Sequence, residues 1–181
     1  MIRVRPAAPA DFDAIAELTV AAYGADGQLD GDHDYDTHLR DVASRAGEGE
    51  LLVAVDPDDS VLGSVTYVLP GSAFAEVARQ GEAEFRMLAV APAAQGRGVG
   101  ELLARACIAR AEEQGCRAVV ICVRDIGAAA RRMYDRIGFS RIPERDWSPY
   151  PGVSLLALRL DLSDPEARTP PSGQAADARR S

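Results

Sequence analysis

The chain of 181 residues contains no lysine, and all 20 of its basic residues are arginines. Without a lysine amine, a protein cannot form the lysine Schiff base on which many carbonyl reactions depend. It also cannot complete the phosphate-binding loop of nucleoside triphosphatases, in which a lysine follows the second glycine. The absence of lysine therefore excludes two common kinds of catalytic site.

Basic charge is scarce relative to acidic charge. The 20 arginines are outnumbered by 28 aspartates and glutamates, and the formal net charge is −8. A nucleic-acid backbone requires a basic surface, so this balance argues against nucleic acid as a partner. It is compatible with a cationic acceptor such as an amine, and equally with acidity that serves only solubility.

Cysteines are few, and their spacing carries no metal signature. The three cysteines, Cys107, Cys116 and Cys122, are odd in number and lack the paired spacing of a zinc site. Cys107 and Cys122 fall within apolar helical and strand patterns, which predicts buried thiols. We therefore expect no bound metal.

Long apolar segments are also missing. No apolar run approaches the length of a membrane span, and the first residues lack an apolar signal segment. These observations predict a cytoplasmic protein with no membrane partner.

The hydrophobic pattern predicts one domain over residues 1–162. Strands are expected at residues 2–5, 51–55, 61–69, 83–90, 118–123, 139–142 and 153–162. Helices are expected after Asp11 as the N-cap, with Ile15, Leu18 and Ala22 on the buried face, and at residues 37–46, 98–114 and 127–137. The apolar strand 118–123 favours parallel pairing across a helical crossover from 83–90. Residues 163–181, rich in proline, serine, alanine and charge, are expected to form a disordered tail.

An acidic stretch at residues 30–38 partly resembles a calcium-binding loop. Tyr35, however, stands where that loop requires glycine, and Asp41 stands where it requires glutamate. We interpret the stretch as part of a solvated loop at residues 24–36.

The most informative feature of the chain is the run Gln95-Gly96-Arg97-Gly98-Val99-Gly100. It follows an apolar strand pattern and opens an amphipathic helix. Glycines at this place let the backbone aim several N–H groups at one anion, and a helix N-terminus adds partial positive charge. The run therefore predicts a pyrophosphate cradle, with a purely structural glycine turn as the alternative.

The spacing of these glycines does not fit a dinucleotide-binding fold. That fold needs Gly-x-Gly-x-x-Gly, whereas Glu101 stands where the third glycine belongs. No acidic residue ends the strand 118–123, where the ribose contact would lie. A nicotinamide- or flavin-dependent oxidoreductase is therefore disfavoured.

Three ordered motifs resemble the GCN5-related N-acetyltransferase (GNAT) superfamily. The Gln-x-x-Gly-x-Gly run is similar to its acyl-CoA-binding motif. Upstream, the segment EFRMLAVAP at residues 84–92 resembles its fourth strand, and downstream, AARRMYDRIGF at residues 129–139 resembles its tyrosine-bearing helix. Together the motifs are far more specific than one glycine run.

The resemblance implies a single-domain α/β fold with a mixed, largely antiparallel sheet flanked by helices. It implies acetyl transfer from acetyl-CoA to a primary amine by direct attack, with no metal. The amides around Gly96, Gly98, Val99 and Gly100 would bind the pyrophosphate, flanked by Gln95 and Arg97. Backbone groups of Leu88 and Val90 would pair with the pantetheine arm as an added strand would.

Two residues match catalytic positions of the superfamily. Tyr134 corresponds to the tyrosine that can give a proton to the departing thiolate, with core packing as its alternative role. Glu84 corresponds to the general base of some members, with a solvated carboxylate or an ion pair to Arg86 as the alternatives. Either Glu84 or a water relay could serve as the base.

The chain departs from the superfamily at one contact. Members often carry asparagine seven residues before the tyrosine, where this chain has Gly127 and contains no asparagine at all. Arg124 or Asp125 could substitute. The departure leaves a second function open, a non-catalytic domain that binds or senses acyl-CoA.

The resemblance also bears on the acceptor side. The acidic stretch would wall the acceptor pocket, so that Asp32, Asp34 and Asp36 would favour a cationic acceptor. Trp147 could border the same pocket or pack at the end of the sheet. Homodimers are common in the superfamily, and a homodimer is therefore possible here.

Overall fold

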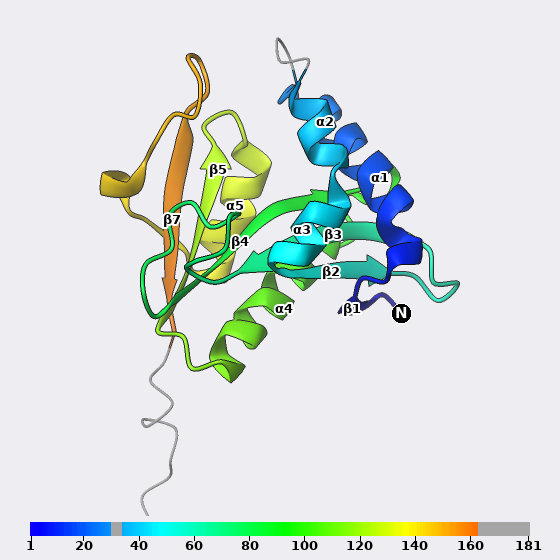
Figure 1. The fold of residues 1–181 in the computed structure, drawn as a ribbon, viewed down its shortest axis with the longest axis horizontal. Coiled ribbons are helices and arrows are strands. Elements are labelled where there is room, and N and C mark those ends of the chain that lie inside the picture. Colours follow the sequence, from blue (N-terminus) through cyan, green and yellow to red (C-terminus); the bar gives the residue numbers. More distant parts are fainter. Residues whose placement is uncertain (30–33, 163–181) are drawn as a thin grey trace, which may run out of the picture.

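The computed structural model describes residues 1–29 and 34–162 as a seven-stranded sheet flanked by helices (Figure 1). The strands lie in the order β1-β2-β3-β4-β5-β7-β6. Their bounds are Arg3–Pro6 (β1), Glu50–Val55 (β2), Val61–Val68 (β3), Glu82–Val90 (β4), Ala118–Arg124 (β5), Ser140–Arg141 (β6) and Leu155–Asp161 (β7). Every pairing is antiparallel except that of β4 with β5. The predicted mixed, largely antiparallel α/β sheet is confirmed.

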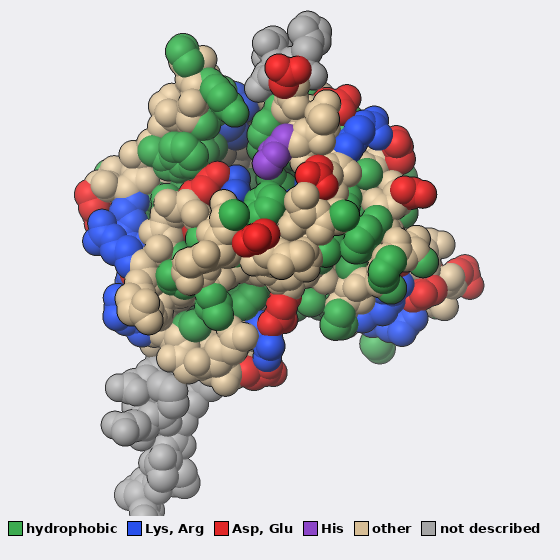
Figure 2. All heavy atoms as spheres, viewed as in Figure 1, with side chains coloured by type: hydrophobic (Ala, Val, Ile, Leu, Met, Phe, Trp, Pro, Cys, Tyr) green, Lys and Arg blue, Asp and Glu red, His purple; other side chains and the backbone are tan. Residues whose placement is uncertain are grey.

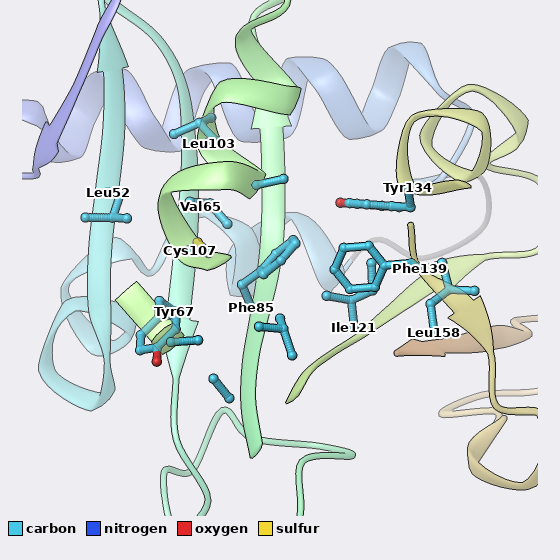
Figure 3. Close-up of a cluster of buried hydrophobic side chains, with 14 of the residues drawn as sticks. Leu52, Val65, Tyr67, Phe85, Leu103, Cys107, Ile121, Tyr134, Phe139 and Leu158 are labelled. Atoms are coloured by element: carbon cyan, nitrogen blue, oxygen red, sulfur yellow. The ribbon is translucent and has the colours of Figure 1, made fainter. Parts of the chain in front are cut away.

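Helices cover both faces of this sheet. One face carries α1, α2 and α3, and the other carries α4 and α5 (Figure 1). Their bounds are Phe12–Ala25 (α1), Tyr35–Arg40 (α2), Val42–Glu48 (α3), Val99–Glu113 (α4) and Ala128–Ile137 (α5). The larger hydrophobic core lies under α4 and α5, where apolar side chains of the central strands meet both helices (Figure 3).

The helices differ from the prediction in three places. The helix expected at 37–46 is two helices, because Asp41 stops α2 and caps α3 by accepting the Ser44 N–H at 3.2 Å. The first helix continues to Ala25, beyond the predicted loop start at residue 24. Asp11 is the N-cap residue of α1, as predicted, but its carboxylate makes no capping bond to the helix; it accepts the Ala8 N–H at 2.7 Å and pairs with Arg5.

The boundaries of the later elements are close to the prediction. Phe139 is buried in the core, and β6 is shorter than expected. Strands β2 and β3 form an antiparallel hairpin, and the predicted crossover from β4 to β5 is present. The predicted tail at 163–181 and residues 30–33 of the acidic stretch, including Asp32, lie outside the described residues.

A bulge changes which face the side chains of β4 occupy. Thr66 pairs with Arg86 and Ser64 with Ala89, so β4 has one residue more than β3 between these pairs. Met87 adopts φ 51° at this point. As a result Phe85 and Leu88, three residues apart, both pack toward α4 and α5.

Strands β4 and β5 separate after a short parallel contact. Their pairing covers only Glu82–Ala118, Ala83–Val119 and Glu84–Val120. Beyond Glu84, β4 pairs only with β3, while β5 continues to Arg124 beside β7. The sheet therefore opens into a V between the C-terminal ends of β4 and β5, a feature that the sequence did not reveal.

Candidate active site

The predicted cradle lies just beyond β4, at the start of α4. Gly96 and Gly98 have φ angles of 74° and 79°, in the left-handed region, and Gly98 is the N-cap of α4. A side chain would meet no atom within 4 Å at either residue, so glycine is needed there for backbone conformation and not for space. Gly100 differs, because a Cβ there would lie 3.3 Å from the sulfur of Met133.

The amides of this turn are free to bind an anion. The first intrahelical bond runs from the Leu102 N–H to the Gly98 carbonyl. Helix geometry leaves the N–H groups of Val99 and Gly100 without intrahelical acceptors. Gln95 and Arg97 are exposed beside the turn, whereas the Val99 side chain is buried in the core. Since Glu101 pairs with Arg105 and Arg136, its carboxylate is already neutralised. The turn therefore fits a pyrophosphate.

The end of β4 offers backbone groups to the V. Ala91 donates its N–H to Leu62 on the β3 side. Because donors alternate along an antiparallel strand, Val90 and Leu88 direct their N–H and C=O groups away from β3. No strand pairs with them there among the described residues. The pantetheine arm predicted to add to β4 would find these groups available.

Tyr134 reaches the V from the α5 side. Its ring packs against Phe139 and Phe85 at centroid distances of 5.5 and 6.0 Å. Figure 3 shows the hydroxyl end pointing toward β4. Burial raises the pKa of Tyr134, which keeps the phenol protonated at neutral pH. The ring therefore packs in the core, as the alternative role from the sequence expects, and the proton-donor role of the hydroxyl stays a prediction.

Glu84 is fully buried, which rules out the solvated carboxylate considered from the sequence. Its exposed fraction is 0%. One oxygen, Oε2, accepts the N–H groups of Glu76, Val77 and Ala78, each at 3.0 Å, and the other has no hydrogen-bond partner. Burial raises the pKa of Glu84 against the lowering effect of these bonds. Arg86, the ion-pair partner considered, pairs with Glu76 instead.

Glu76 and Arg86 form a half-buried ion pair on the α1–α2 face. Their side chains are 18% and 17% exposed. Arg86 also donates to the Phe74 carbonyl at 2.8 Å. Burial raises the pKa of Glu76 to about 7, opposed by Arg86 and assisted by Glu84. The pair therefore includes a carboxylate that exchanges its proton near neutral pH.

Aromatic rings surround this pair. Tyr23 lies 6.1 Å from Tyr35, Tyr35 lies 5.7 Å from His38, and His38 stacks on Phe74 at 6.0 Å between ring centroids. Figure 2 views this face and shows apolar side chains meeting charged ones of both signs. These contacts line a surface on which a small apolar group with one charge could rest.

Trp147 and Cys122 lie on the β5–β7 side of the same region. Trp147 forms an isolated bridge with Leu155 and is 37% exposed. Burial raises the pKa of Cys122 to about 12, which keeps the thiol protonated. Cys107 and Cys116 are buried, whereas Cys122 is only partly buried.

Other predicted contacts are placed as follows. A Cβ at Gly127 would lie 3.1 Å from the Arg124 carbonyl oxygen, so asparagine would be tight there. Arg124 donates to the Gln28 carbonyl at 3.4 Å, and Asp125 accepts the Ile126 N–H. Asp36 pairs with Arg40, which neutralises one member of the predicted acidic wall.

Within the described residues no group of three or more acidic, histidine or cysteine side chains is arranged to hold a metal ion. In the same part of the chain, no helix has the length and apolarity that crossing a membrane demands.

Comparison with known proteins shows which family the chain belongs to. The model of the Acetyltransferase (GNAT) family matches residues 12–139. The chain therefore belongs to the GNAT family of acetyltransferases. It is 28% identical over 124 residues to a mycothiol acetyltransferase of Renibacterium salmoninarum, a match that covers 66% of this chain and 36% of the relative. The chain thus spans about a third of that relative's length.

Solved structures agree with the fold. A GCN5-related N-acetyltransferase from Kribbella flavida superposes with a TM-score of 0.61 at 29% identity, covering 89% of this chain and 98% of that one. A PaiA N-acetyltransferase from Thermoplasma acidophilum, solved in complex with coenzyme A, gives 0.69 at 14% identity over 90% and 99% of the two chains.

Sequence reasoning missed Glu76 and Tyr23. Glu76 lies in the loop between β3 and β4, and Tyr23 lies in the last turns of α1; neither belongs to a motif. Only tertiary contacts bring them to Arg86 and to the V, so no local pattern could have found them.

Proposed function

We propose that the protein is an acetyl-CoA-dependent N-acetyltransferase that acts on a primary amine. The observation that carries this proposal is the juxtaposition of free amides at Gly98–Gly100 with the V between β4 and β5. Acetyl-CoA would supply the acetyl group and a thiolate leaving group. The family assignment and the coenzyme A complex of a structural neighbour support the same co-substrate.

The residues around the V suggest a division of labour. The cradle amides and Arg97 hold the pyrophosphate, and Leu88 and Val90 hold the arm by backbone hydrogen bonds. Tyr134 is protonated and buried, so it can donate a proton where a sulfur departs. Glu84 was the base expected from the resemblance; its burial beneath residues 76–78 favours a supporting role.

The acceptor amine could belong to a small molecule, a peptide N-terminus or a lysine side chain. One relative is named a mycothiol acetyltransferase, but the chain covers about a third of it. We therefore include a thiol-bearing small amine among the acceptors to be screened. A cytoplasmic location and a homodimer stay predictions from the sequence.

The first experiment is calorimetric titration of the protein with acetyl-CoA, CoA and NAD. We expect micromolar binding of acetyl-CoA and CoA, no binding of NAD, and release of free thiol when an acceptor amine is added. Absence of CoA binding would overturn the transferase proposal.

A non-catalytic acyl-CoA sensor is the second candidate, favoured by Gly127 at the position of the usual asparagine. It predicts CoA binding without thiol release for every amine tested. Acetyl transfer to any of these amines, lost when Tyr134 is replaced by phenylalanine, would exclude it.

A further inference from the structure

We propose that Glu76, and not Glu84, is the carboxylate that takes the proton from the acceptor ammonium, on the face of the sheet covered by α1 and α2. This inference rests on the proposed acetyl transfer and names a base that the motif resemblance does not. Glu84 becomes a positioning residue that fixes the loop on which Glu76 stands.

The contacts of Glu84 make it a poor base. A general base must come within hydrogen-bond reach of the proton that it removes. Glu84 is 0% exposed, and its Oε2 already accepts three N–H groups from the loop that covers it. Exposing the carboxylate would break these three bonds and leave three N–H groups of the loop without their acceptor.

The same bonds set the position of Glu76. The Glu76 N–H is one of the three donors to Glu84, so the backbone of Glu76 is fixed to β4. Its carboxylate then turns to Arg86, which also holds the loop through the Phe74 carbonyl. Since 18% of the Glu76 side chain remains exposed, a small ligand can reach it without unfolding the loop.

Charged and titratable groups from every neighbouring element surround Glu76. Strand β4 contributes Arg86 and Glu84, which lower and raise the pKa of Glu76 respectively. Three further groups come from other elements: Tyr23 from α1, Tyr35 from α2 and Cys122 from β5. The negative charge of Glu76 raises the pKa of each of these groups. Arg45 on α3 and His38 on α2 stand farther off, beside Arg86.

The V connects Glu76 to Tyr134. Tyr23 lies within electrostatic reach of Glu76 on its own face, and it also raises the pKa of Tyr134 on the opposite face. Tyr23 is therefore within electrostatic range of both groups. A thioester held in the V would therefore have Tyr134 on one side and the Glu76 region on the other.

The proton balance of the step is complete. The acceptor arrives as R–NH₃⁺ and gives one proton to the Glu76 carboxylate, which leaves a free lone pair on nitrogen. The new C–N bond forms, the C–S bond breaks, and nitrogen loses a second proton. One of the two protons ends on the sulfur, through Tyr134, and the other passes from Glu76 to solvent.

The first test needs no acceptor. In protein labelled with ¹³C at the glutamate carboxyl carbons, we expect one resonance to titrate with a midpoint near pH 7. It should vanish in Glu76→Gln and persist in Glu113→Gln, a matched control in which an exposed glutamate paired with Arg110 is changed. A midpoint below about 5.5 would mean an ordinary carboxylate and overturn the proposal.

The second test is kinetic, with tyramine as the probe amine and free thiol as the readout. We expect Glu76→Gln to lower kcat/KM about 100-fold at pH 7, while CoA affinity stays unchanged. In this variant the fall of kcat/KM on the acid side of the pH profile should also disappear. Glu84→Gln should keep the acid limb and lose less than about 10-fold, as expected of a positioning residue. The reverse result for the two variants would reject Glu76. Loss of CoA binding by the wild type would instead reject the proposed function.

Discussion

Within β4, residues 82–84 pair with β5, and Glu84 pairs with β3 as well, whereas residues 85–90 pair only with β3. The first part carries Glu82, which is 1% exposed and pairs with Arg145 at 2.6 Å and with Arg159. The second part carries the free backbone groups of Leu88 and Val90. The difference teaches that one end of the strand holds a buried ion-pair network, whereas the other leaves backbone groups without a paired strand.

Replacing Glu82 by glutamine should cause the largest loss. Removing one partner of a buried ion pair leaves the other charges uncompensated, which typically costs about 3–5 kcal/mol. Because Arg159 is partly exposed, we expect about 3 kcal/mol in urea unfolding. Glu113→Gln, an exposed site, should stay within about 0.5 kcal/mol. Equal losses of stability in Glu82→Gln and Glu113→Gln would mean that the buried ion pairs of Glu82 do not stabilise the fold.

The pH dependence of stability should separate Glu82, in the first part of β4, from Glu76, which pairs with Arg86 in the second part. The arginines lower the pKa of Glu82 to about 2 from 4.5, so it stabilises the fold above pH 4.5. This contribution, about 3 kcal/mol, is lost as the pH falls toward 2. The raised pKa of Glu76, about 7, acts in the opposite direction, and stability should rise as the pH falls from 7 to 5.

Unfolding free energies measured across this range should therefore peak near pH 5. In Glu76→Gln, the unfolding free energy should no longer change between pH 5 and pH 7, whereas its fall below about pH 4.5 should remain. A curve that declines steadily from pH 7 to pH 5 would contradict the burial of the Glu76 carboxylate.

Tyr134→Phe tests the open part of the strand. It removes one hydroxyl and keeps the ring that packs on Phe85 and Phe139. We expect kcat to fall about 100-fold, with CoA affinity within about twofold. If CoA affinity fell as much as kcat, the hydroxyl would be a binding contact and not a proton donor.

Gly98→Ala should have the smallest effect. Its φ of 79° disfavours any side chain by about 1–2 kcal/mol, and the change disturbs the cradle. Gly115, at the other end of α4, has φ 71° and equally open surroundings, so Gly115→Ala is a matched control. We expect similar losses of stability in both variants, and weaker CoA binding, by about 10-fold, only in Gly98→Ala. Equal CoA binding in the two would mean that the turn is structural.

Much of the fold could be predicted from local pattern. The buried strand 118–123, the helix that begins beyond Gly98 and the largely antiparallel sheet were all expected. Boundaries failed where competing hydrogen bonds decide, as at Asp41, whose side chain splits one expected helix into two. At Asp11 the predicted helix start was right, but Arg5 and the Ala8 N–H take the carboxylate that was expected to cap the helix.

The sequence by itself determined the glycine turn, since Gly96 and Gly98, just before α4, permit the left-handed backbone that the turn adopts. It also determined the family, through motifs that are contiguous along the chain. Only the tertiary structure decided that β4 and β5 part after Glu84, that Glu84 is buried beneath a loop, and that Glu76 pairs with Arg86. Positive φ angles and helix starts are local properties, whereas burial and pKa depend on atoms that distant segments bring together.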